Sequence, residues 1–364
     1  MEETKMIRRR KLAAAISAAA VASLLFTGFT SGAANAATPS WCGPKKITMG
    51  LTDGFGGNNW RLVTTAAAQD EIKKCKSVTK LLYADGQGNT TKAISDIKGM
   101  VAKGVKALVV FPDAGKAMLP ALRAAYKAGV KTVPYRVDPS GVNGKDFDIW
   151  IGGDFVNDGK NWGTWIKKNF PTGANILFLS GPAGNSQGLD ELKGMKSVLT
   201  SSTYKFIGES PFEVTNWDGA QTQKVLTAAI AKYPKIDVIV SDFGPVMVSS
   251  LGEFTKSGRS IPAMATSDGN ILGCFYLDNV NKKGNEDMKL MTVATGNDHV
   301  RLAVQHAVAR ATGGKIPAAT RFKSPVFEDS ETGKPQGVQC NRKIADFTFL
   351  SAQMSGVEQQ KLLK

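Results

Sequence analysis

The stretch KITMGLTDGFGGNNWRL, residues 46–62, decides the fold. It starts with an apolar run of strand character (46–52), passes through a glycine-rich loop, and enters a helical pattern that extends from about Trp60 to Lys76. A short buried strand followed at once by an amphipathic helix is typical of a parallel βαβ unit. The rest of the chain shows whether that unit is repeated.

Apolar runs of strand character alternate with helical patterns along the whole chain. After the first unit they continue with 78–84, a helix from about Thr91, 106–111, a helix from about Lys116, and 130–135. In the second half the strand-like runs are 175–180, 204–210, 237–241, 262–266 and 289–295. Strands buried on both faces and separated by helices indicate parallel sheets with right-handed crossovers, so the sequence predicts an α/β fold.

The first residues carry the pattern of a signal peptide. A basic segment (8–11) precedes a small or apolar run from Leu12 to about Phe29, and Ala34-Asn35-Ala36 forms a cleavage site of the A-x-A type. A transmembrane anchor is disfavoured because Ala, Ser and Thr dilute the run. No cysteine stands at the cleavage point, which disfavours a lipid anchor. We expect cleavage after about Ala36 and export to the periplasm.

Charge and cysteine usage limit the possible partners. The formal net charge is +15, of which +12 lies beyond the signal peptide; there the lysines are scattered without a dense basic run, so a solvated basic surface is expected and no nucleic-acid partner. The chain has four cysteines and only two histidines, which leaves a zinc site without ligands. Two disulfides are expected in an oxidising compartment. Of the three possible pairings, Cys42–Cys75 with Cys274–Cys340 is favoured, because each bridge then closes within one half of the fold.

Polar and aromatic side chains follow nearly every predicted strand. In open parallel sheets, ligands bind in the crevice beyond the carboxyl ends of the strands. Planar polar groups suit pairs of hydroxyl groups, and flat rings suit the C–H face of a sugar, so this composition indicates a carbohydrate site. The segment after the strand 237–241 is Asp242-Phe243, of which Phe243 is taken as the candidate. The ligand-binding candidates are Asn58, Trp60, Arg61, Asp85, Asp113, Arg136, Asp138, Asp154, Asn185, Asp190, Asn216, Trp217, Phe243, Asp268, Thr295 and Asn297.

Two motifs suggest other functions but lack the required partners. The loop Gly54-Phe-Gly56-Gly57 misses the third glycine of a dinucleotide fingerprint, and no Gly-Lys pair is followed by Ser or Thr. Gly184-Asn-Ser186-Gln-Gly188 matches the nucleophile elbow of esterases. However, Gly-Pro-Ala separates it from its strand, and the later histidines, 299 and 306, lie within a helix. Capping of the following helix by Asn185 and Ser186 is the simpler role.

These residues together resemble the periplasmic sugar-binding proteins of ABC importers, in the ribose-, galactose- and galactofuranose-binding group. The resemblance covers about 46–317. It is carried by Asn58-x-Trp60-Arg61, by the segments 83–97, 101–112, 180–195 and 216–226, by Ser267-Asp268-Gly269, and by TGND at 295–298. In this comparison Trp60 forms an aromatic wall and Arg61 binds ring or hydroxyl oxygens.

The resemblance implies two similar lobes, each a parallel sheet flanked by helices, joined by a hinge of three crossings. The crossings are expected near 153–154, 295–296 and 325–326. Lobe one then comprises 45–153 and 296–325, and lobe two comprises 154–295 and 326–364. The sequence also departs from the ribose-type pattern. Leu189 stands where an arginine is usual, Arg136-Val137 replaces Asp-Arg, and Phe243 replaces an asparagine.

The hypothesis is therefore a periplasmic solute-binding protein without catalytic residues, cofactor or metal. It captures a pentose, a furanose-form hexose or a related polyol and docks transiently, as a monomer, on the membrane subunits of an ABC permease. An exported esterase that uses Ser186 and a sugar-sensing partner of a chemoreceptor are the alternatives.

Overall fold

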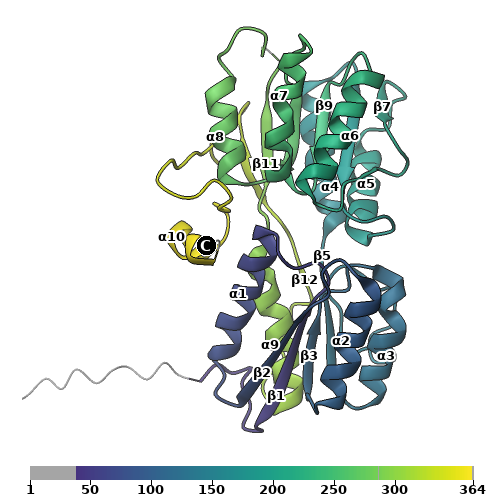
Figure 1. Cartoon of the computed structure of the whole chain (residues 1–364), viewed down its shortest axis with the longest axis vertical. Coiled ribbons are helices and arrows are strands. Elements are labelled where there is room, and N and C mark those ends of the chain that lie inside the picture. The colour runs from purple at the N-terminus through teal and green to yellow at the C-terminus, as the bar shows by residue number, and fades with distance from the viewer. Residues whose placement is uncertain (1–37, 286, 363–364) are drawn as a thin grey trace, which may run out of the picture. The chain divides into compact units, whose positions relative to one another are not determined.

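Two β-sheets form the framework of the residues that the computed structural model describes, 38–285 and 287–362. The predicted signal peptide lies outside these described residues. Within each sheet the strands run parallel, except one at the edge of the second sheet, and helices cover both faces (Figure 1). The predicted α/β fold class is confirmed. Within the described ranges, no helix has both the length and the apolar character needed to cross a membrane.

The first sheet has six strands, and alternation along each strand supplies both of its buried faces. Ala107 and Val109 point to the face covered by helices α1 (Asn59–Lys73) and α9 (Val300–Thr312), while Leu108 and Val110 pack under α2 (Thr90–Ala102) and α3 (Leu119–Lys127). In sheet order the strands are β12 (Arg321–Phe322), β5 (Ile151–Gly153), β4 (Lys131–Arg136), β3 (Ala107–Val110), β1 (Ile47–Asp53) and β2 (Val78–Asp85).

The second sheet is built in the same way. Leu177 and Ile239 face α6 (Gly219–Lys232), α7 (Val248–Lys256) and α8 (Asn270–Asn279), whereas Ile176 and Val238 face α4 (Phe155–Asn169) and α5 (Ser186–Val198). In sheet order the strands are β13 (Val326–Asp329), β11 (Leu290–Val293), β10 (Ala263–Ser267), β9 (Val238–Ser241), β6 (Ala174–Ser180) and β7 (Tyr204–Ile207), and β8 (Glu213–Val214) also pairs with β6.

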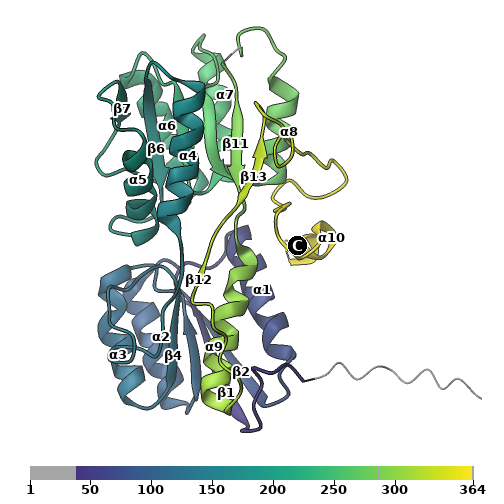
Figure 2. The same cartoon turned by 180° about the vertical axis from the view of Figure 1, so that it is seen from behind.

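The chain passes from one sheet to the other three times. The passages lie between β5 and α4, between β11 and α9, and between β12 and β13, and Figure 2 shows the last two running close together. The crossings expected from the sequence fall in these segments. We propose that the segments form the hinge and that 45–153 with 296–325, and 154–295 with 326–364, are the two lobes.

The last segment, residues 339–362, is here called the C-terminal arm. Backbone carbonyls of Asp346 and Thr348 accept hydrogen bonds from the amides of Ile271 and Asn270, at the first residues of α8. The N-terminal amides of a helix have no partners within the helix, so the arm satisfies donors that would otherwise be unpaired. A side chain at Gly273 would collide with the backbone carbonyl of Gln339, which explains why glycine stands there.

The arm also reaches elements of the first sheet. The amide of Gln353 donates to the Asp298 carboxylate, 2.7 Å away, just before α9. Helix α10 (Gly356–Leu362) contacts α1, and Leu362 packs against the apolar cluster beneath α1 and α9. The C-terminal arm, which the sequence assigns to lobe two, therefore contacts helices of both sheets.

Both expected disulfides are present. Cys42–Cys75 joins the segment before β1 to the end of α1, and Cys274–Cys340 joins α8 to the C-terminal arm, with Cα atoms 5.3 and 4.7 Å apart. The pairing favoured by the sequence is confirmed.

Replacing Cys274 and Cys340 together with serine should lower the free energy of unfolding by about 2–4 kcal/mol, because the unfolded chain loses the constraint of a closed loop. Chemical unfolding followed by circular dichroism measures this change. The matched double variant Cys42→Ser with Cys75→Ser removes a disulfide that closes a loop of half the length, with a sequence separation of 33 instead of 66. It should have an effect about 0.6 kcal/mol smaller. An unchanged unfolding midpoint in both double variants would contradict the stabilising role.

Candidate functional site

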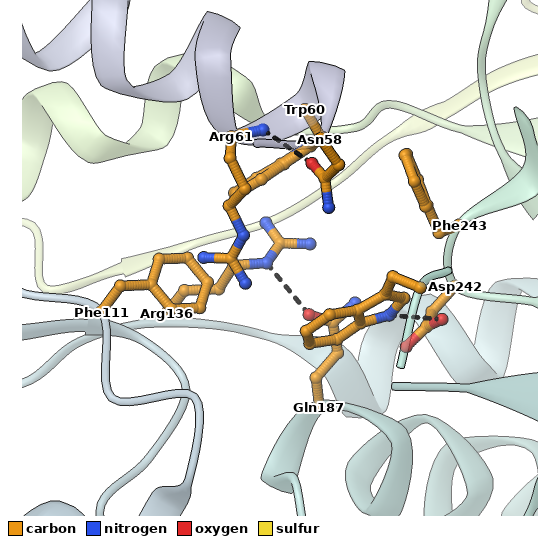
Figure 3. A pocket seen from close by; sticks show the side chains of 9 residues that line it. Asn58, Trp60, Arg61, Phe111, Arg136, Gln187, Asp242 and Phe243 are labelled. Carbon is orange, nitrogen blue, oxygen red and sulfur yellow. Dashed lines mark hydrogen bonds between the residues drawn. The ribbon is translucent and has the colours of Figure 1, made fainter. Parts of the chain in front are cut away.

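A pocket lies where strand ends of the two sheets come together. It holds about 320 Å³, including space open to solvent. Its lining side chains come from the start of α1, from the ends of β3 and β4, and from α5, the turn before α6 and the end of β9 (Figure 3). The lining residues are Asn58, Trp60, Arg61, Phe111, Arg136, Gln187, Trp217, Asp242 and Phe243.

The glycine-rich loop places the start of helix α1 at this pocket. The Asn58 side chain accepts a hydrogen bond from the amide of Arg61 at 3.0 Å and so caps the helix. Trp60 follows in the first turn, and its indole Nε1 donates to the carbonyl of Thr295 at 3.2 Å. A cap and a ring hydrogen bond thus fix the first turn of α1, together with the two side chains that enter the pocket.

Arg61 is a buried cation with its counter-charges supplied by the protein. Its Nη2 bonds to Asp113 Oδ1 at 2.5 Å, and its Nη1 lies 3.4 Å from Asp53 Oδ1. The guanidinium carbon lies 3.6 Å from the ring centroid of Phe111, at a distance typical of a cation–π contact. Arg61 therefore joins the ends of β1 and β3 to α1, and its position is held from three sides.

Arg136 enters the pocket from the end of β4 in an unusual backbone conformation. Its φ of 67° lies in the left-handed region, which side chains other than glycine rarely occupy. Its Nε donates to Gln187 Oε1 at 3.0 Å (Figure 3). Gln187 Nε2 in turn donates to Glu191 at 3.1 Å. Such strain persists where the surroundings require it and is frequent at ligand sites.

Trp217 approaches from the second sheet through a turn of the same kind. Asn216 and Trp217 have φ values of 51° and 55°. The indole Nε1 donates to Asp242 Oδ1 at 2.9 Å, and the ring covers Gly181, where any side chain would collide with it. Asp242 also accepts from Ser180 Oγ at 2.7 Å. Burial raises the pKa of Asp242 to about 6, against the opposing effect of these hydrogen bonds.

Several predicted site residues lie near the pocket without lining it. Asp113 pairs with Arg61, and together with Asn216 it borders a neighbouring cavity. Asn297 holds the backbone of Trp60, because its Nδ2 donates to the Trp60 carbonyl at 3.1 Å and its Oδ1 accepts from the Thr295 hydroxyl. Asp113 and Asn297 thus position Arg61 and Trp60, and the second carboxylate oxygen of Asp113 is buried without a hydrogen-bond partner.

Other predicted site residues serve turns and helix starts. Asp154 caps the start of α4, and Asn185 caps the start of α5. The Asp85 carboxylate accepts a hydrogen bond from the amide of Gln87. Asp138 accepts the amide of Ser140, while its own amide donates to Ser186. Asp190 lies on α5 outside the pocket lining, and burial raises the pKa of its carboxyl group.

Asp268 is fully buried and is bound by the C-terminal arm. Its Oδ2 accepts the amide of Ser351 at 3.0 Å, and its Oδ1 accepts the Ser351 hydroxyl at 2.5 Å and the amide of Thr295 at 3.1 Å. These bonds occupy a carboxylate that the resemblance assigns to the ligand. The geometry supports a structural role for Asp268, which joins the end of β10 to the arm.

Three lining residues were not singled out from the sequence. Phe111 and Asp242 directly follow β3 and β9, so the strand-end rule contained the signal for both. Gln187 lies within the α5 N-terminus, beside the residues considered as an elbow and cap, and nothing in its local pattern distinguishes it. Phe243 lines the pocket as predicted from its position, with Phe349 of the arm behind it at a ring distance of 6.3 Å.

Ser186 lacks the surroundings of an esterase nucleophile. Its hydroxyl accepts the amide of Asp138 at 2.9 Å. His306 is bonded through Nε2 to the carbonyl of Ala319, and the His299 ring packs on Phe322. Among the described residues, therefore, no histidine is hydrogen-bonded to this serine, and the elbow motif serves as the start of α5.

The chain belongs to a family that matches this architecture, the periplasmic binding protein domain, whose model covers residues 51–295. The ribose import binding protein of Bacillus subtilis is 23% identical over 238 residues, which are 64% of this chain and 75% of that protein. The D-xylose-binding periplasmic protein of Escherichia coli is 26% identical over 194 residues, 52% of this chain and 57% of that one. The fold is also similar to the Caulobacter myo-inositol binding protein bound to myo-inositol, with a TM-score of 0.67 and 20% identity over 77% of this chain and 93% of that one.

Replacing Asp268 with alanine should destabilise the ligand-free protein by about 2–3 kcal/mol, because the Ser351 and Thr295 amides lose a buried charged acceptor. Thermal and chemical unfolding measure the loss. Asp278→Ala is the matched control, since that carboxylate is about half exposed and pairs only with Arg342 on the surface; it should change stability by less than about 1 kcal/mol.

A double-mutant cycle with Ser351→Ala separates the arm contact from other effects of the Asp268 change. A coupling of at least about 0.5 kcal/mol is expected for groups in direct hydrogen-bond contact. Normal stability of Asp268→Ala together with lost ligand binding would instead support direct ligand contact.

Proposed function

We propose that this chain captures a monosaccharide or a related polyol in the pocket and delivers it to the membrane subunits of an ABC importer. One observation carries the proposal: two tryptophan rings, Trp60 and Trp217, reach one pocket from different sheets, and hydrogen-bond donors of Arg61 and Arg136 share it with them. Aromatic faces bind the apolar C–H surface of a sugar, while guanidinium and amide groups bind its hydroxyls.

The fixed orientation of both rings supports this proposal. Each indole Nε1 is bonded within the protein, Trp60 to the Thr295 carbonyl and Trp217 to Asp242, so the ring faces are presented in defined positions. A preorganised site loses little conformational entropy on binding. The neighbouring guanidinium groups are likewise held before a ligand arrives.

The size and chemistry of the site favour a small ligand. A pentose, a furanose-form hexose or a cyclic polyol matches the few polar groups and the limited space. Similar proteins are named for binding ribose and xylose, and proteins of similar fold are named for binding myo-inositol and galactofuranose. These names are consistent with a ligand of this size and chemistry. Leu189 is exposed on the surface and outside the lining, so the arginine that ribose-type proteins carry there has no equivalent in this pocket.

Export is part of the proposal. The two disulfides suit an oxidising compartment, and the family is periplasmic by name. We propose that the signal peptide is cleaved after about Ala36 and that the mature protein works in the periplasm as a monomer that docks transiently on the permease.

Native mass spectrometry of the protein purified from its source should detect a bound molecule with the mass of a pentose, a hexose, a polyol or a derivative of one of these. Thermal shift against a panel of these compounds should then raise the melting temperature with at least one of them, because a ligand that binds only the folded state stabilises it. Absence of any bound compound and of any shift would contradict the proposal.

Trp60→Phe and Trp217→Phe should each weaken binding of that compound at least tenfold, equivalent to about 1.4 kcal/mol. Phenylalanine keeps a ring but loses both area and the hydrogen bond that orients it. Trp150→Phe is the matched control, because Trp150 lies outside the pocket and stacks on Arg321. Isothermal calorimetry measures the three affinities, and unaltered binding in both pocket variants would disprove the aromatic clamp.

A further inference from the structure

Arg136 stands out because its charge has no counter-charge in contact with it. The side chain is buried, with 8% of its surface exposed, and it lines the pocket. Its Nε is bonded to the neutral amide of Gln187, and its Nη1 has no hydrogen-bond partner. Within the described residues Arg136 forms no ion pair, whereas Arg61 in the same pocket has both Asp113 and Asp53.

The groups packed around Arg136 are mainly uncharged. The rings of Trp60 and Phe155 flank its guanidinium, with centroids 4.7 and 5.0 Å away. The neighbouring Tyr135 hydroxyl is neutral, because burial raises its pKa to about 12. These contacts exclude water from the cation and give it no negative partner.

Carboxyl groups farther from Arg136 supply only part of a counter-charge. Burial raises the pKa of Asp158 to about 7 and that of Asp242 to about 6, and it raises the pKa of Glu191 well above its usual value. Burial thus disfavours the charged form of each of these acids, and each acts on Arg136 from beyond ion-pair distance. A buried charge without a partner is strongly unfavourable.

We propose that the ligand carries one carboxylate, which pairs with Arg136 in the pocket: the substrate class is a sugar acid or a polyhydroxylated acid. This inference rests on the proposed function and narrows it. Nη1 of Arg136 is a buried donor without a hydrogen bond; Nη1 of Arg61 also makes no hydrogen bond, although it lies 3.4 Å from Asp53, and both arginines line the pocket. A carboxylate presents two acceptor oxygens to such donors, and the bonds it forms with a guanidinium are short and charge-assisted.

The charge count favours a carboxylate over a phosphate. One unpaired cation balances one negative charge, and the loop at 54–57 lacks the glycine pattern of a phosphate cradle. The backbone strain at Arg136 is consistent with this role. The left-handed turn directs the guanidinium into the pocket, where the aromatic rings of Trp60 and Phe155 contact it. Its negative partner is then the carboxylate of the ligand.

Calorimetry with matched pairs tests the inference: D-galactose against D-galacturonate and D-galactonate, L-arabinose against L-arabinonate, and D-ribose against D-ribonate and D-ribose 5-phosphate. In at least one pair the carboxylate should bind at least tenfold more tightly than the neutral sugar. If the tightest compound is neutral, the inference is overturned and the proposed function stands. If the phosphate is tightest, the carboxylate assignment is overturned. If no compound binds, both fail.

Variants of Arg136 provide the second readout. Arg136→Gln should weaken carboxylate binding at least a hundredfold, and it should weaken binding of the neutral partner by a smaller factor, about tenfold or less, because neutral hydroxyls form weaker bonds with the guanidinium than a carboxylate does. Its ligand-free melting temperature should not fall, because an unpaired buried charge is removed. Arg136→Lys keeps the charge and should retain a preference for the acid. Arg123→Gln, an arginine 44% exposed and paired with Asp146, removes the same charge elsewhere and should leave both affinities unchanged. Equal loss of both compounds in Arg136→Gln would overturn the inference.

Discussion

Helices cover both faces of both sheets, and this constraint determines where polar chemistry can occur. Inside the layers most strand residues meet apolar side chains, so a charged group there would lose water and would rarely gain a partner. The strand ends are the positions at which side chains leave the apolar layers and can bond to one another. Arg61, Asp53 and Asp113 meet at the ends of β1 and β3 for this reason, and Trp217 meets Asp242 at the end of β9.

The same constraint explains why much of the molecule could be predicted from the sequence. Each long strand and helix carries its own periodic pattern, and in parallel sheets polar residues after the strands must share one edge. Trp60, Arg61 and Arg136 all follow strands in the sequence, and all three line the pocket. The short strands β5, β8 and β12 have two or three residues each, which is too few to show a period. They were missed for that reason.

What local pattern could not show is the partner of each polar group. Asp268 follows its strand as a ligand-binding residue would, yet its oxygens are bonded to Ser351, more than eighty residues later in the chain. Gln187 has an ordinary position near a helix start and gains its importance only from Arg136. Charge pairing behaves in the same way: Arg61 and Arg136 look alike in the sequence, and only the three-dimensional arrangement shows that one is paired within the protein and the other is not.

The C-terminal arm has a practical consequence for anyone who would turn this protein into a reporter of its ligand. The arm is joined to α8 by a disulfide, to Asp268 by the amide and the hydroxyl of Ser351, and to α1 by packing of α10. A fluorescent domain fused to that end would pull on the segment that binds Asp268 and packs against α1. A label at the exposed loop around Val142 avoids those contacts, and a second label on an exposed residue of the other sheet's helices would report the proposed hinge movement without a load on the arm.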